Sequence, residues 1–145
     1  MTRYWALLLL LILSCGPGST SKVYEDLSRQ DQARFDKYIL LGKDVYEQNC
    51  LSCHQADGNG LRGIIPPLVN SDYLEQNQEY LPCLLRHGTK DTIIVNGKTY
   101  PPQMPAHTIS NIELAEVITF INNSWGNEIK FVPVKEIDRL LQNCH

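Results

Sequence analysis

The chain has 145 residues, of which 43% are hydrophobic and 20% charged, and its formal net charge is −3. This length suffices for one domain but not for two of ordinary size, and the composition is that of a globular protein. Lys and Arg form no block that could serve as a nucleic-acid footprint, so we exclude a nucleic-acid-binding protein.

Residues 1–14 have the pattern of a secretory signal peptide. Arg3 gives a positive start, and residues 4–13 form a nearly unbroken apolar run that is too short to span a bilayer. The segment Ile12-Leu13-Ser14-Cys15 then resembles the bacterial lipobox, and this resemblance implies that Cys15 becomes the lipidated first residue. The alternative is an ordinary signal peptide in which Cys15 is incidental. We expect the lipid-anchored form, facing the periplasm of a bacterial cell envelope.

Residues 15–30 would then be the lipidated start of the mature chain followed by a flexible tether. The stretch 16–21 is small and polar and has no helical or strand periodicity. Fully extended, residues 16–30 would reach roughly 50 Å above a membrane.

A first helix is predicted over residues 31–49, where Asp31 could cap the first turn. Apolar or small residues recur there at helical spacing, namely Phe35, Ile39, Gly42 and Tyr46. Residues 54–70 follow, and their glycines and prolines predict a loop.

The rest of the chain alternates short helices with loops and a hairpin. Asn96-Gly97 is a strong turn signal between strands at residues 92–95 and 98–100. Ser110 and Glu113 have the spacing of a capping box, which opens a helix to about residue 123. Further helices are predicted over residues 71–76, 79–87 and 134–143.

These elements predict an all-α fold with a small β-hairpin and long loops. The domain would cover residues 31–132, and residues 133–145 would be a C-terminal helical extension packed on it. Long loops build a poor core by themselves. We therefore expect a large apolar cofactor to fill the middle of the domain.

Cys50-Leu51-Ser52-Cys53-His54 is the attachment sequence of c-type haem. Two thiols separated by one helical turn can form thioethers with the two vinyl groups of one haem, and the adjacent histidine can then bind the iron. A thioredoxin-like pair would need a βαβ context, and a structural zinc site would need four ligands. The sequence offers neither, so we predict one covalent haem c held by Cys50 and Cys53, with His54 as an iron ligand.

A second iron ligand is expected on the other face of such a haem. The sequence contains two methionines, and one of them is Met1, so a thioether ligand would be Met104. Met104 lies among prolines on a polar loop, where no helical stripe explains it as a core residue. His107 is the competitor and would give a bis-histidine site, whereas His87 and His145 are expected to be non-ligands.

Residues 31–127 resemble class I cytochrome c. The resemblance implies that Pro66 accepts a hydrogen bond from the second ring nitrogen of His54, and that Leu68 packs against the haem. It also implies that the first helix crosses the last helix of the domain closely, with Gly42 and Tyr46 at the crossing and Phe120 as the partner aromatic. The ending Asn123-Ser124-Trp125-Gly126-Asn127 is similar to small monohaem cytochromes that serve oxidases or form haem domains of dehydrogenases and reductases.

Cys83 and Cys144 have no role in haem attachment. An oxidising envelope compartment disfavours free thiols. A disulfide between them would hold the last helix on the domain, but the sequence does not fix their distance. Two free buried thiols or an intermolecular bridge are the alternatives.

We predict a monomeric electron carrier rather than an enzyme, because two filled axial positions leave no open coordination site for a substrate. The carrier would pass single electrons between respiratory partner proteins, and the first alternative is a haem subunit of a dehydrogenase or reductase complex. Its docking interfaces would be small and transient. A small peroxidase would need an open distal site, and a gas sensor would need Met104 to dissociate. No catalytic residue is predicted.

Overall fold

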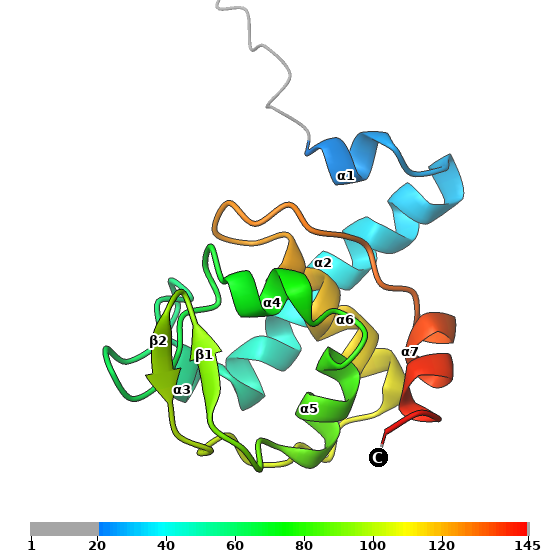
Figure 1. The fold of residues 1–145 in the computed structure, drawn as a ribbon. Helices are drawn as coiled ribbons and strands as arrows, with labels where there is room; N and C mark the ends of the chain where they lie inside the picture. The colour runs from blue at the N-terminus through cyan, green and yellow to red at the C-terminus, as the bar shows by residue number, and fades with distance from the viewer. Residues whose placement is uncertain (1–20, 145) are drawn as a thin grey trace, which may run out of the picture.

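The computed structural model describes residues 21–144. Cys15, the signal peptide and His145 lie outside these residues. Within them the helices are α1 Lys22–Glu25, α2 Arg29–Asn49, α3 Leu51–His54, α4 Asp72–Gln76, α5 Leu81–His87, α6 Asn111–Asn122 and α7 Val134–Leu141. The strands β1 Ile93–Val95 and β2 Lys98–Tyr100 form an antiparallel hairpin (Figure 1). The predicted class, mostly helical with one small hairpin, is confirmed.

Polar caps set where the main helices begin. Ser28 caps α2 through the backbone N–H of Asp31, so α2 begins at Arg29, two residues before the predicted start. The predicted capping box of α6 is present: the Ser110 hydroxyl accepts from the Glu113 N–H, and the Glu113 carboxylate accepts from the Ser110 N–H.

The segment before α2 differs from the prediction of a flexible tether. Residues 22–25 form the single turn α1, and the Tyr24 ring lies 5.6 Å from the Phe35 ring. The Gln32 side chain also donates a hydrogen bond to the Tyr24 carbonyl at 3.1 Å. The expectation of a tether is therefore wrong for residues 22–30, because aromatic packing and caps order them against α2.

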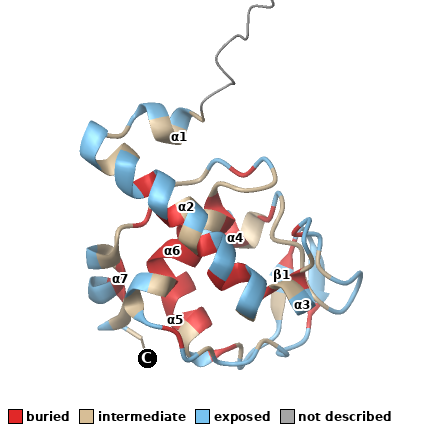
Figure 2. Ribbon diagram, turned by 180° about the vertical axis from the view of Figure 1, so that it is seen from behind, coloured by how far each residue is buried: buried red, intermediate tan, exposed pale blue. Residues whose placement is uncertain are grey.

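The close crossing of α2 and α6 forms the centre of the molecule. A Cβ at Gly42 would overlap the backbone carbonyl of Glu116 and lie 2.8 Å from the Cβ of Phe120. Figure 2 shows that α6 is buried along most of its length. Tyr46 of α2 packs against Phe120 and Trp125, with ring centroids 5.4 and 5.2 Å apart. The predicted close approach at Gly42 is present.

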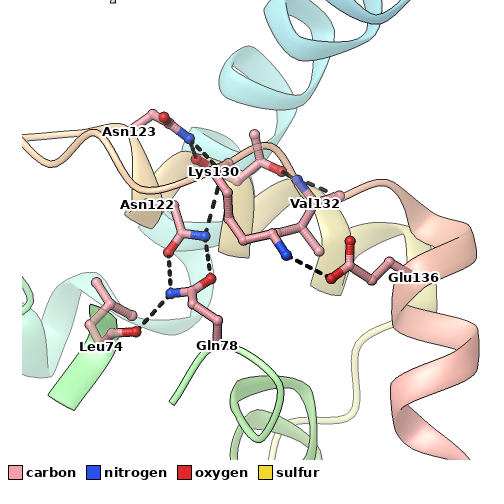
Figure 3. Close-up of polar contacts among 8 residues, drawn as sticks. Leu74, Gln78, Asn122, Asn123, Lys130, Val132 and Glu136 are labelled. Atoms are coloured by element: carbon pink, nitrogen blue, oxygen red, sulfur yellow. Dashed lines mark hydrogen bonds and ion pairs between the residues drawn. The ribbon is translucent and has the colours of Figure 1, made fainter. Parts of the chain in front are cut away.

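A partly buried amide pair ties the chain between α4 and α5 to α6. Gln78 donates to the side-chain carbonyl of Asn122 at 2.9 Å and accepts from its amide at 2.7 Å (Figure 3). Gln78 also donates to the Leu74 carbonyl, while the Asn123 side chain donates to the Lys130 carbonyl. Paired amides of this kind fix the relative position of the segments that carry them.

The last helix packs on α5 and α6. Ile137 is fully buried, and the structure contains a disulfide between Cys83 of α5 and Cys144, with Cα atoms 5.5 Å apart. Helix α7 ends at Leu141, two residues before the predicted end. Within residues 21–144, no helix is both long enough and apolar enough to cross a membrane.

Gly42→Ala tests the close helix crossing. Alanine favours a helix by about 1 kcal/mol over glycine, but the added methyl overlaps the Glu116 carbonyl, so we expect a net loss of about 1–3 kcal/mol of unfolding free energy. Guanidinium unfolding measures it. Leu40→Ala on the same helix, where the side chain is 65% exposed, is the control and should change little. A Gly42→Ala variant as stable as the wild type would contradict the close crossing.

Candidate functional site

An apolar cavity of about 190 Å³ lies between α3, α4, α5 and the hairpin. Its walls come from segments distant in the sequence, which the fold brings together at one end of the molecule (Figure 1). The aliphatic and aromatic lining includes Leu68, Tyr73, Leu74, Leu81, Leu84, Leu85, Ile93, Val95, Tyr100 and Ile121. Such a wall suits a large, flat, mostly apolar ligand.

The two thiols of the attachment sequence lie at the junction between α2 and α3. Cys50 has non-helical backbone angles, so it ends α2 and precedes the single turn of α3. The His54 N–H then returns to the Cys50 carbonyl at 2.8 Å. Cys50 is buried and Cys53 is exposed, and both are free thiols. Burial is the main cause that raises the pKa of the Cys50 thiol to about 11, and Cys53 contributes.

The ring of His54 is buried and held at one nitrogen. Its Nδ1 lies 3.2 Å from the carbonyl oxygen of Pro66, so Nδ1 carries the proton in this contact and Nε2 keeps its lone pair. Burial lowers the pKa of the imidazole, the hydrogen bond to Pro66 raises it, and nearby His107 lowers it again. Burial therefore favours the neutral ring, the form that binds a metal.

The loop after His54 is fixed by Trp125. The indole N–H donates to the Ala56 carbonyl at 2.9 Å, and the ring lies so close to Gly58 that a Cβ there would approach it to 2.7 Å. Gly58 has a φ of +69°, a conformation that also favours glycine. Its carbonyl accepts from the Leu68 N–H at 2.7 Å, which sets the chain just after Pro66.

Asn127 fixes the same loop from the other side. Its side-chain carbonyl accepts from the Asn70 N–H, and its amide donates to the carbonyls of Leu68 and Ile121, each at 3.0 Å. Asn127 is 8% exposed, so these backbone groups have little access to water as an alternative partner. The clamp joins the loop that follows Pro66 to the end of α6.

Met104 reaches the cavity from the chain that follows the hairpin. The Asn96-Gly97 turn, with both residues at positive φ, returns the chain as predicted, and Tyr100 is buried at the end of β2. Met104 is partly buried, packs against the core and lines the cavity, although its neighbouring prolines are exposed. His107 also lines the cavity, whereas His87 does not.

The residues proposed from the sequence to hold the haem all line this one cavity: Cys50, Cys53, His54, Pro66, Leu68 and Met104. Two free thiols one turn apart, an imidazole kept neutral by burial, a thioether and an apolar wall match what covalent haem requires. Within the described residues, no three His, Cys, Asp or Glu side chains gather into a group that could hold a metal ion.

Several residues that shape the site did not emerge from the sequence. The face of α5 formed by Leu81, Leu84 and Leu85 had a usable signal in its i, i+3, i+4 spacing. Asn127 had none, because it acts through backbone groups up to 59 residues away. Trp125 was noted only as part of the chain ending, and nothing in its position in the sequence indicated contact with Gly58.

Residues 39–125 match the cytochrome c family. Cytochrome c-552 of Thermus thermophilus is 34% identical over 94 residues, which are 61% of this chain and 71% of that protein. The cytochrome c subunit of a quinone alcohol dehydrogenase from Gluconacetobacter polyoxogenes is 31% identical over 118 residues, 77% of this chain but 24% of that subunit. A gluconate 2-dehydrogenase cytochrome c subunit from Pantoea cypripedii is 28% identical over 99 residues, 61% of this chain and 21% of its own length. The chain thus spans about a quarter or less of these dehydrogenase subunits.

Asn127→Ala removes all three hydrogen bonds of the clamp. A buried backbone group that loses its hydrogen-bond partner costs up to about 1–3 kcal/mol. For the three groups together, we expect a loss of about 2–4 kcal/mol in unfolding free energy. Guanidinium unfolding followed by far-UV circular dichroism measures it. Asn143→Ala is the control, because Asn143 is exposed and makes one long hydrogen bond at 3.4 Å. Equal stability of the two variants would show that Asn127 does not hold the loop.

Proposed function

Because this chain belongs to the cytochrome c family, we propose that it is a single-electron carrier whose haem is attached through Cys50 and Cys53 and ligated by His54 and Met104. Members of the family transfer electrons through a covalently attached haem. Beyond the family, we propose the particular attachment and ligand residues, the cellular location and the partners.

The observation that carries the proposal is the convergence of His54 and Met104 on one apolar cavity, although 50 positions separate them in the chain. The Pro66 carbonyl occupies Nδ1 of His54, which leaves Nε2 as the nitrogen for a metal. His107 lines the same cavity and remains the competing ligand. A thioether favours the ferrous state relative to a second nitrogen and raises the reduction potential.

When bound, the haem supplies an iron that cycles between the ferrous and ferric states. The protein residues supply a fixed environment for that change. His54 is held in one orientation by a backbone carbonyl, and the leucines of α5 give the cavity an apolar wall. A rigid, apolar surrounding keeps structural rearrangement small when the charge changes. These properties support a carrier.

A haem domain working within a dehydrogenase complex is the second candidate. It is supported by the 31% identity to the cytochrome c subunit of a quinone alcohol dehydrogenase. The chain covers 24% of that subunit, so such a role would be that of one haem domain. Isolation of the native protein with or without a stoichiometric partner distinguishes this candidate from a free carrier.

We propose that a lipid on Cys15 anchors the protein to a membrane of the bacterial cell envelope, with the domain in the periplasm. The described residues begin at Ser21, and residues 15–21 can span at most roughly 20 Å between anchor and domain. A short connection keeps the carrier close to membrane-bound donors and acceptors. It also restricts the orientations in which the domain can meet them.

Spectra of the wild type and Met104→Ala test the iron ligands. We expect the ferric wild type to show the weak far-red band of sulfur ligation, and Met104→Ala to lose it and bind carbon monoxide in the ferrous state, because the distal position opens. His107→Ala is the matched control and should keep the band. If Met104→Ala leaves the spectrum unchanged, the distal ligand is His107 or absent, and the peroxidase and gas-sensor alternatives gain support.

Cys15→Ser tests the anchor. A serine cannot receive the thioether-linked lipid, so we expect the wild type in the membrane fraction and the variant in the periplasmic fraction, with the same haem spectrum. Fractionation with labelled fatty acid measures both. Unchanged membrane association without label in either protein would contradict the anchor while leaving the electron-carrier proposal intact.

A further inference from the structure

We infer that Thr89 is a positioning residue that holds Met104 in the cavity, an inference that rests on the proposed ligation by Met104. Thr89 follows Gly88, the C-cap of α5, and lines the same cavity as Met104 and His54. Neither the motif nor the spacing of the sequence indicated it.

Thr89 and Met104 are joined by two hydrogen bonds of opposite direction. The Thr89 backbone N–H donates to the Met104 carbonyl at 3.0 Å, and the Met104 N–H donates to the Thr89 hydroxyl at 3.0 Å. Both backbone groups of Met104 are therefore held by one residue. The rotation of the Met104 backbone is fixed at the point where its side chain departs toward the cavity.

The composition of the loop explains why a side chain is needed here. Pro101, Pro102 and Pro105 have no backbone N–H, so the segment around Met104 cannot be held by a regular ladder of strand hydrogen bonds. The Met104 N–H is one of few donors in this segment, and the hydroxyl of Thr89 provides its acceptor. Valine at position 89 would keep the shape and remove that acceptor.

The end of α5 brings Thr89 into place. Gly88 has a φ of +74°, and a Cβ there would lie 2.6 Å from the Met104 carbonyl oxygen. The end of α5 and the segment around Met104 can therefore approach this closely only with glycine at position 88. The His107 N–H also donates to the Leu85 carbonyl at 3.0 Å. The loop of residues 101–107, called the methionine loop below, is thus hydrogen-bonded to the end of α5 at residues 104 and 107, on either side of the exposed Pro105 and Ala106.

Helix α5 is held on both of its faces, by buried packing on one and by the disulfide on the other. Leu84 and Leu85 are buried along the cavity, and Cys83 is bonded to Cys144 beyond α7. A ligand loop fastened to such a support loses less entropy when the sulfur binds the iron. Removal of the Thr89 hydroxyl should therefore weaken the iron–sulfur contact without emptying the haem site.

The experiment compares Thr89→Val, Thr89→Ser and Thr99→Val as ferric holoproteins in a titration with imidazole, which competes with Met104. Thr99 lies exposed on β2 and serves as the matched control. Loss of one hydrogen bond typically corresponds to about a fivefold to tenfold change in an equilibrium, so we expect Thr89→Val to bind imidazole about that much more tightly. The far-red band should weaken in the same variant. Thr89→Ser and Thr99→Val should match the wild type.

The outcomes separate failure of the inference from failure of the proposed ligation. A wild type without the far-red band overturns ligation by Met104 and this inference with it. A wild type with the band, and a Thr89→Val variant with unchanged band and imidazole affinity, overturns only the role of Thr89. Failure of Thr89→Ser to behave as the wild type would also overturn it, because serine retains the hydroxyl that accepts from Met104. Far-UV circular dichroism and haem content establish that each variant is folded.

Discussion

The close crossing of α2 over α6 at Gly42 is the constraint on which the site depends. Helix α2 runs directly into Cys50 and the attachment sequence, so its position sets that of both thiols and of His54. Helix α6 contributes Ile121 to the cavity, and the chain that leaves it provides Trp125 and Asn127. Both residues hold the loop that carries Pro66. A shift of one helix relative to the other would therefore move His54 away from the carbonyl that orients its ring.

The two residues proposed to bind the iron are positioned by different means. The ring of His54 is fixed through its own side chain, by a single contact from Nδ1 to a backbone carbonyl. The flexible side chain of Met104 has no polar atom that could be held so firmly, so its backbone is fastened instead. In both cases a glycine lets the backbone approach closely, Gly60 beside the Pro66 carbonyl and Gly88 beside the Met104 carbonyl. Loops rather than helices thus determine the geometry of the site, and the helices hold the loops.

Features set by neighbours in the sequence could be predicted, and features set by distant contacts could not. The capping box at Ser110 and the turn at Asn96-Gly97 involve residues within four positions of each other, and the structure has both. The start of α2 was misplaced because Ser28 and Asp31 are both good cap residues, and the structure uses Ser28. The partner of Cys83 was left open, since chain spacing says nothing about a distance across 61 residues.

The chain beyond residue 125 lies outside the match to the family, yet it contacts the parts that shape the cavity. Asn127 holds the loop after Pro66, and Val132 exchanges hydrogen bonds with the buried Thr119 of α6. Helix α7 then buries Ile137, and the disulfide links the chain end to α5, whose opposite face lines the cavity. The extension therefore contacts α5 on the side away from the cavity, while the residues proposed to bind haem contact it on the cavity side. Because the methionine loop is fastened to the end of this helix, the stability of the extension and the geometry of the proposed sulfur ligand are physically connected.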